Sequence, residues 1–201
     1  MKKIVACILM TFGWMSLAHA AGDATAGQGK IALCAGCHGA DGNSMVASFP
    51  KLAGQGERYL VKQMNDIRSG ARVIPEMTAM LDNMSEQDIA DIAAYFAGQT
   101  STVGAAKAEL VVAGEMMYLA GNAAKSIPAC AACHSPTGAG NAQAGFPSLG
   151  GQHAAYTSKQ LKNFRTEMRT NDDATIMRQV AALMSDKEIE AVASYIQGLS
   201  N

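Results

Sequence analysis

The sequence has few aromatic side chains, which make up 5% of its 201 residues. A small domain with so few of them has difficulty burying enough apolar surface to be stable alone. We therefore expect a further component in the core, and a large planar cofactor would serve. Basic residues form no cluster, and the formal net charge is −1. The sequence therefore gives no sign of a nucleic-acid-binding surface, and no nucleic-acid partner is expected.

The apolar run from Ile4 to Leu17 is shorter than the roughly 20 residues that a membrane-spanning helix needs. It follows two lysines and precedes Ala-His-Ala at residues 18–20, which is the order of parts in a secretory signal peptide. Cys7 lies in the middle of the apolar run, away from this cleavage site, which argues against a lipoprotein signal. We predict that residues 1–20 are removed and that the mature protein lies outside the cytoplasm.

The chain contains two copies of one pattern. The offset between matching positions drifts from 96 residues (Cys34 to Cys130) to 100 residues (Ser85 to Ser185). Many matches at a slowly drifting offset indicate a duplicated domain. We predict an N-terminal domain at 21–98, an uncharged linker at 99–106 and a C-terminal domain at 107–201.

Each copy has the pattern of a helical domain. Ser85 and Ser185 are each followed three residues later by an acidic residue, which predicts capping boxes at the start of a helix. Apolar residues then recur at helical spacing as far as Gly98 and Gly198, which are expected to end these helices. Two further helices are expected at residues 57–69 and 154–168. No segment alternates with a period of two, so the predicted fold class is all-α.

Four cysteines remain after removal of residues 1–20, and they form two Cys-x-x-Cys-His motifs: Cys34, Cys37 and His38, and Cys130, Cys133 and His134. Cys-x-x-Cys-His is the attachment sequence of haem c. Positions i, i+3 and i+4 share one face of a helix, so both thiols can reach the vinyl groups while the imidazole faces the iron. A disulfide, a redox dithiol or half of a zinc site would also fit one motif. Duplication within a repeated helical domain favours two covalently bound haem c groups.

The repeat also predicts the distal iron ligand among 13 methionines. Met77 and Met177 each lie eight residues before the capping serine of their copy. Met84 and Met184 also match each other and are the main rivals. They directly precede the capping serines, where an apolar residue commonly packs against the helix start. We therefore predict Met77 and Met177 as the ligands.

Two prolines and one histidine complete the list of candidate residues. Pro50 and Pro147 follow the motif histidines within matching Phe-Pro-x-Leu segments. They fit a turn, and we expect each proline carbonyl to accept a hydrogen bond from the ligand histidine and so to fix the ring. His153 aligns with Gly56, so it has no counterpart in the first copy and is expected on a loop or at the surface.

Each half resembles a class I c-type cytochrome in its order of attachment motif, proline and methionine before a last helix. The whole mature chain resembles the di-haem cytochrome c4 family, notably at residues 54–60, 144–153 and 171–173. The resemblance implies two tandem class I cytochrome c domains related by a pseudo-twofold axis, with neighbouring haems. It also implies that His38 with Met77, and His134 with Met177, are the axial pairs.

The predicted function is electron transfer without catalysis, because His/Met ligation leaves no open iron position for a substrate. The resemblance implies a periplasmic carrier in a respiratory chain, with a quinol-oxidising complex or another donor, a terminal oxidase as acceptor, and possible peripheral association with the membrane. One alternative is the di-haem acceptor subunit of a flavocytochrome dehydrogenase. Another is a di-haem peroxidase, against which the scarce histidines and the matched methionines argue.

Overall fold

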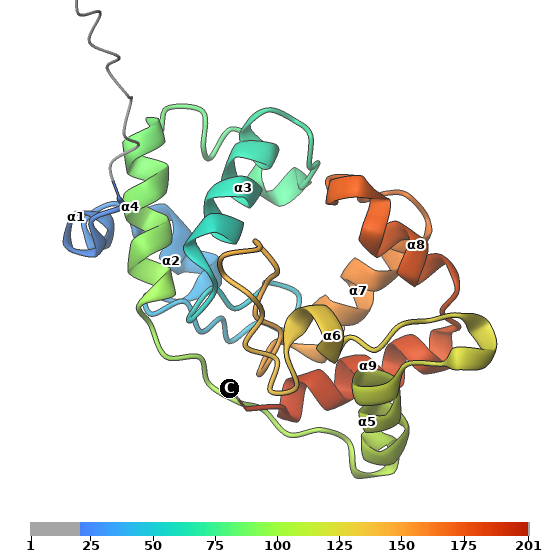
Figure 1. Cartoon of the computed structure of the whole chain (residues 1–201). Coiled ribbons are helices and arrows are strands. Elements are labelled where there is room, and N and C mark those ends of the chain that lie inside the picture. Colours follow the sequence, from blue (N-terminus) through green and yellow to red (C-terminus); the bar gives the residue numbers. More distant parts are fainter. Residues whose placement is uncertain (1–20, 201) are drawn as a thin grey trace, which may run out of the picture.

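The computed structural model describes residues 21–200, so the predicted signal peptide at 1–20 lies outside the described residues. Within residues 21–200 the regular elements are α-helices and short 3-10 turns, with two isolated β-bridges and no strand. This confirms the all-α prediction. Figure 1 shows α1–α4 on one side of the molecule and α5–α9 on the other.

The two halves share the order of their main helices, and the second half has additional short elements. The first half contains α1 (Ala24–Gln28), α2 (Ala32–His38), α3 (Glu57–Arg68), the 3-10 turn Pro75–Met77 and α4 (Glu86–Ala97). The second half contains the 3-10 turn Ala108–Leu110, α5 (Val111–Ala120), the 3-10 turn Ala123–Lys125, α6 (Ala131–His134), α7 (Ala154–Arg165), the 3-10 turn Asp173–Thr175, α8 (Ile176–Ala182) and α9 (Asp186–Gly198). Among the described residues, α8 has no α-helical counterpart between α3 and α4, where only the 3-10 turn Pro75–Met77 is found.

Three helix ends differ from the prediction, the smallest difference being that α3 ends at Arg68 instead of residue 69. Helix α7 ends at Arg165 instead of residue 168, because the backbone leaves the helical region and reaches a φ of 58° at Glu167. Gly98 caps α4 as predicted, whereas Gly198 is the last residue of α9 and Leu199 caps that helix.

The terminal helices α4 and α9 begin at the predicted capping boxes. Ser85 Oγ accepts from the backbone N–H of Asp88, and Ser185 Oγ accepts from that of Glu188. The apolar faces of these helices lie at the centre of the two cores, formed by Ile31, Leu60, Ile92, Ala93 and Phe96 in the first half and by Met117, Tyr118, Ile127, Met184, Ile189, Val192 and Ile196 in the second. Each half thus has its own core.

In each half the first helix crosses the terminal helix at a glycine. A Cβ atom on Gly27 would lie 2.0 Å from the carbonyl oxygen of Asp91 in α4. A Cβ atom on Gly114 would lie 2.3 Å from the carbonyl oxygen of Ala191 in α9. Only glycine permits such a close approach of two backbones.

The segment at 99–106 connects α4 to α5 and is hydrogen-bonded to both halves. Lys51 Nζ of the first half donates to the carbonyl oxygen of Thr102 at 2.5 Å. The N–H of Gly104 donates to the carbonyl oxygen of Gln197, in α9, at 3.0 Å. These contacts help to fix the two halves relative to each other.

Candidate haem-binding sites

Each attachment motif lies on one helical turn. Helix α2 carries the first motif, and α6, with Cys130 as its N-cap residue, carries the second. Within residues 21–200 none of the four cysteines of these motifs is in a disulfide. Burial raises the pKa of the Cys130 thiol to about 11, and it also raises the pKa of Cys34. In each motif the two thiols and the imidazole lie on the same helical turn, as covalent attachment of a haem requires.

Both motif histidines are held by the predicted proline carbonyls. Nδ1 of His38 lies 2.9 Å from the carbonyl oxygen of Pro50, and Nδ1 of His134 lies 2.9 Å from that of Pro147. A ring that donates from Nδ1 keeps Nε2 unprotonated and free to bind a metal. Burial lowers the pKa of both histidines, and the bond to the proline carbonyl opposes this effect only in part. Both rings are thus suited to act as neutral iron ligands.

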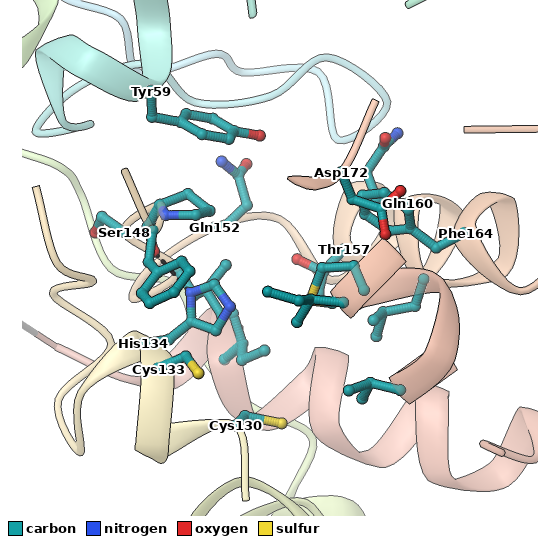
Figure 2. A pocket seen from close by; sticks show the side chains of 18 of the residues that line it. Tyr59, Cys130, Cys133, His134, Ser148, Gln152, Thr157, Gln160, Phe164 and Asp172 are labelled. Atoms are coloured by element: carbon teal, nitrogen blue, oxygen red, sulfur yellow. Dashed lines mark hydrogen bonds between the residues drawn. The ribbon is translucent and has the colours of Figure 1, made fainter. Parts of the chain in front are cut away.

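A cavity in the second half extends to the first half. Its lining includes Cys130, Cys133, His134 and Met177, together with apolar residues of α7, α8 and α9 and several residues of the first half. Figure 2 shows Cys133 and His134 on one side of this cavity, with Thr157 and Phe164 on the other. The cavity therefore places a histidine, two thiols and two methionines around one space.

The methionines occupy different environments. Met177 lies near the start of α8, is half-buried and lines the cavity, whereas Met184 is 4% exposed and belongs to the core of the second half. Met184 also borders the cavity. In the first half, Met77 ends a 3-10 turn and Met84 packs against the core. The assignment of Met77 and Met177 as iron ligands stays a prediction.

His153 lies in the loop that leads into α7, where it also contacts the other half. It is half-buried as the N-cap residue of α7, and its Nε2 lies 2.8 Å from the carbonyl oxygen of Ser44 in the other half. The predicted loop position of His153 is therefore confirmed, whereas its contact with the other half was not predicted, because sequence spacing cannot show which segment of the other half approaches it.

Two buried arginines hold the halves together in a reciprocal pattern. Arg72 of the first half donates to Tyr156 OH at 3.0 Å and to Gln160 Oε1 at 3.2 Å, both in α7. Arg169 of the second half donates to Tyr59 OH at 3.1 Å and to Gln63 Oε1 at 3.0 Å, both in α3. The members of each pair stand at matching positions of the repeat, so the interface has the form expected of a pseudo-twofold axis.

These arginines were not predicted from the sequence. The offset of 97 residues that relates Arg72 to Arg169 also relates Tyr59 to Tyr156, and this shared offset was an available signal. The acceptors named above are neutral oxygens, and both guanidinium groups are buried, at 7% and 8% exposure. Buried positive charge on the border of a cavity suits an anionic group within it. Arg169 itself lines the cavity.

The described residues fit a haem in this space. The two propionates of a haem are anionic and would be stabilised by the buried guanidinium group of Arg169, which lines this cavity. The hydroxyl of Thr157 supplies a further observation, because Oγ1 is buried, lines the cavity and has no hydrogen-bond partner within residues 21–200. Buried polar atoms normally have a partner, which indicates that another group belongs beside it.

The family model described as cytochrome c matches residues 24–99 and 115–200. Cytochrome c4 of Pseudomonas aeruginosa is 58% identical over 99% of this chain and 100% of its own length. The thiosulfate dehydrogenase electron acceptor of Stutzerimonas stutzeri is 41% identical, over 81% of this chain and 76% of its own length. The structure of reduced recombinant cytochrome c4 from Pseudomonas stutzeri has a TM-score of 0.88 and 57% identity, and covers 89% of this chain and 100% of that chain.

None of the helices within residues 21–200 has the length and apolar character needed to cross a membrane.

Proposed function

The chain belongs to the cytochrome c4 family, and from this premise we propose that it carries electrons in a respiratory chain of the periplasm, from a donor such as a quinol-oxidising complex to a terminal oxidase. It carries two covalently bound haem c groups and is an electron-transfer protein, not an enzyme. The observation that best supports the proposal is that each half presents a paired-thiol motif with a buried, carbonyl-bound histidine.

We assign roles to the residues as follows. Cys34 and Cys37, and Cys130 and Cys133, hold the two cofactors covalently. His38 and His134 would bind the two irons through Nε2, and Met77 and Met177 would supply the second protein ligand of each iron. When bound, each haem supplies the reversible one-electron chemistry of its iron. The protein keeps the ligand set closed, so that no substrate reaches the metal.

Arg72 and Arg169 are proposed to have a second role beside joining the halves. A buried guanidinium stabilises neighbouring carboxylates through charge-assisted hydrogen bonds. We assign the haem propionates to this interface, where both arginines lie. The same positive charges favour the reduced haem, because reduction makes the iron site less positive.

Location and domain limits follow from the sequence. The order of parts at residues 1–20 supports secretion to the periplasm. We place the domains at 21–98 and 107–201, with the linker at 99–106, because the terminal helices α4 and α9 close a core in each half. We propose peripheral association with the membrane, which membrane fractionation tests.

A second candidate function is to accept electrons from a dehydrogenase. The relative from Stutzerimonas stutzeri, named as the electron acceptor of thiosulfate dehydrogenase, supports it. The predicted alternative of a flavocytochrome subunit belongs to the same class of function. In both functions the protein exchanges electrons only with proteins.

Stopped-flow mixing distinguishes the two candidates. The reduced protein should be oxidised rapidly by a purified terminal oxidase, and the rate with a charged partner should fall as salt is added. Slow oxidation by the oxidase, together with rapid reduction of the oxidised protein by thiosulfate dehydrogenase and thiosulfate, would favour the second candidate.

A further inference from the structure

Each half contains a glutamine that reaches into the other half. Gln55 and Gln152 each follow a glycine at a matching position of the repeat, five residues after Pro50 and Pro147. The two glycines have φ angles of 68° and 74°, and this left-handed turn suits glycine. Both glutamines are buried, at 7% and 8% exposure. The two glutamines therefore occupy equivalent positions in the two halves.

The amide of each glutamine forms two hydrogen bonds with one backbone segment of the other half. Gln152 Oε1 accepts from the N–H of Lys51 at 2.9 Å, and Gln152 Nε2 donates to the carbonyl oxygen of Lys51 at 2.9 Å. Gln55 Oε1 accepts from the N–H of Ser148 at 2.8 Å, and Gln55 Nε2 donates to the carbonyl oxygen of Ser148 at 2.9 Å. The arrangement is therefore reciprocal.

The N–H groups of Lys51 and Ser148 belong to the peptide units that hold the motif histidines. The carbonyl of the unit joining Pro50 to Lys51 accepts from His38 Nδ1, and the N–H of the same unit donates to Gln152. The unit joining Pro147 to Ser148 is bonded in the same way to His134 and Gln55. In a chain of hydrogen bonds each bond polarises the next, and the effect is stronger where water is excluded.

We propose that Gln152 is a positioning residue for His38 in the opposite half, that Gln55 is the equivalent for His134, and that each glutamine lowers the reduction potential of the haem across the interface. An N–H that donates to a glutamine makes its own peptide carbonyl a stronger acceptor. The histidine bound to that carbonyl becomes more electron-rich, which stabilises ferric iron. This inference rests on the proposed function of His38 and His134 as iron ligands.

The test uses the complete protein with both haems bound. Gln152→Met keeps the length of the side chain and removes both hydrogen bonds to Lys51, together with the local bond that Gln152 Oε1 accepts from the N–H of His153. Two reduction potentials are measured by optical titration, and each is assigned to its half by the NMR signals of the haem methyl groups. We expect Gln152→Met to raise the potential of the haem in the first half and to leave the other haem close to its original potential. Gln55→Met should give the mirror result.

Tyr156→Phe is the matched control. It removes one hydrogen bond across the same interface, to Arg72, without touching either peptide unit. Its effect on the haem of the first half should be smaller than that of Gln152→Met. Three results would overturn the inference. They are a change in potential in Tyr156→Phe equal to that in Gln152→Met, a changed potential only for the haem of the half that carries the glutamine substitution, or unchanged potentials in both glutamine variants. Gln152→Leu serves in the same role if Gln152→Met lowers the haem content.

Spectra of the unmodified protein show whether a negative result concerns only the glutamines or also the proposed iron ligands. If the unmodified protein shows low-spin, six-coordinate haems with histidine ligation, the proposed iron ligands are supported even when the glutamine variants do not change the potentials. If the unmodified protein lacks such spectra, the ligand assignment itself fails, and this inference fails with it.

Discussion

The distal methionines show how far a duplicated sequence can assign single residues. Met77 and Met177 share a position in the repeat, but so do Met84 and Met184. The structure adds that Met184 is held within the core, whereas Met177 is half-buried beside the cavity that contains His134. A methionine fixed by core packing has little freedom to turn its sulfur toward an iron atom, which favours Met177.

Met77→Ala and Met177→Ala are each expected to weaken the methionine–iron charge-transfer absorption of the oxidised protein by about half, and to lower one reduction potential, because a thioether ligand raises it. Absorption spectra and an optical redox titration check this. Met184→Ala is the control, expected to keep the absorption while losing about 2–5 kcal/mol of stability through the cavity it leaves. Loss of the absorption in Met84→Ala or Met184→Ala would show that the rival pair binds the irons.

At the residue scale, the sequence predicted what depends on short spacing. The thiols and the imidazole of each motif lie on one helical turn, and the proline carbonyls bind the histidines as expected. The partners of Gln55, Gln152 and His153 were beyond reach, because they lie in the other half and no local periodicity encodes them.

Among the elements, the terminal helix α9 allows a test of charge at its capping box. Glu188 accepts from Lys125 at 2.7 Å and from Ser185, and these bonds lower its pKa to about 2. Its unfolded pKa is about 4.3. The stabilisation is therefore present above about pH 4.3 and is lost as the pH falls toward 2.

Glu188→Gln should thus melt at a lower temperature than the unmodified protein at neutral pH, and the difference should shrink as the pH is lowered through this range. Glu190→Gln is the control, since Glu190 is exposed on the same helix. Thermal melts at several pH values, followed by circular dichroism, measure the effect. A difference in melting temperature that stays constant from neutral pH down to pH 2 would contradict the account.

The crossing of α5 over α9 depends on Gly114, where a Cβ atom would meet the carbonyl oxygen of Ala191. We expect Gly114→Ala to destabilise the protein by about 1–3 kcal/mol, because the two backbones must separate. Gly36→Ala is the control: a Cβ atom added there would have no neighbouring atom within 4 Å, and the second motif already has alanine at this position. Denaturant unfolding measures both, and equal stabilities of the two variants would refute the close crossing.

The sequence predicted which segments are helical and where the terminal helices begin, but it did not predict where the first and terminal helices of each half cross. The capping boxes at Ser85 and Ser185 are local signals, and both are present in the structure. Gly27 and Gly114 lie at different distances before their attachment motifs, because the second half carries extra residues between α5 and α6. A fixed-offset comparison therefore could not pair them.

For the whole molecule, the interface arginines link assembly to redox behaviour. Arg169→Gln should lower at least one reduction potential, because it removes a positive charge beside the cavity. Arg169→Lys keeps the charge but not the planar, forked donor, so it should change the potentials less while still weakening the interface. Redox titration and denaturant unfolding report the two effects separately. Unchanged potentials in Arg169→Gln would show that this charge does not act on the haems.

The central claim is that one chain holds two closed, histidine- and methionine-ligated haems for electron transfer. An optical redox titration of the purified protein tests it most directly. The account predicts two one-electron steps per chain, with the methionine–iron absorption of both haems present in the fully oxidised form and lost on reduction. A single one-electron step, or a high-spin ferric haem that persists at neutral pH, would contradict it.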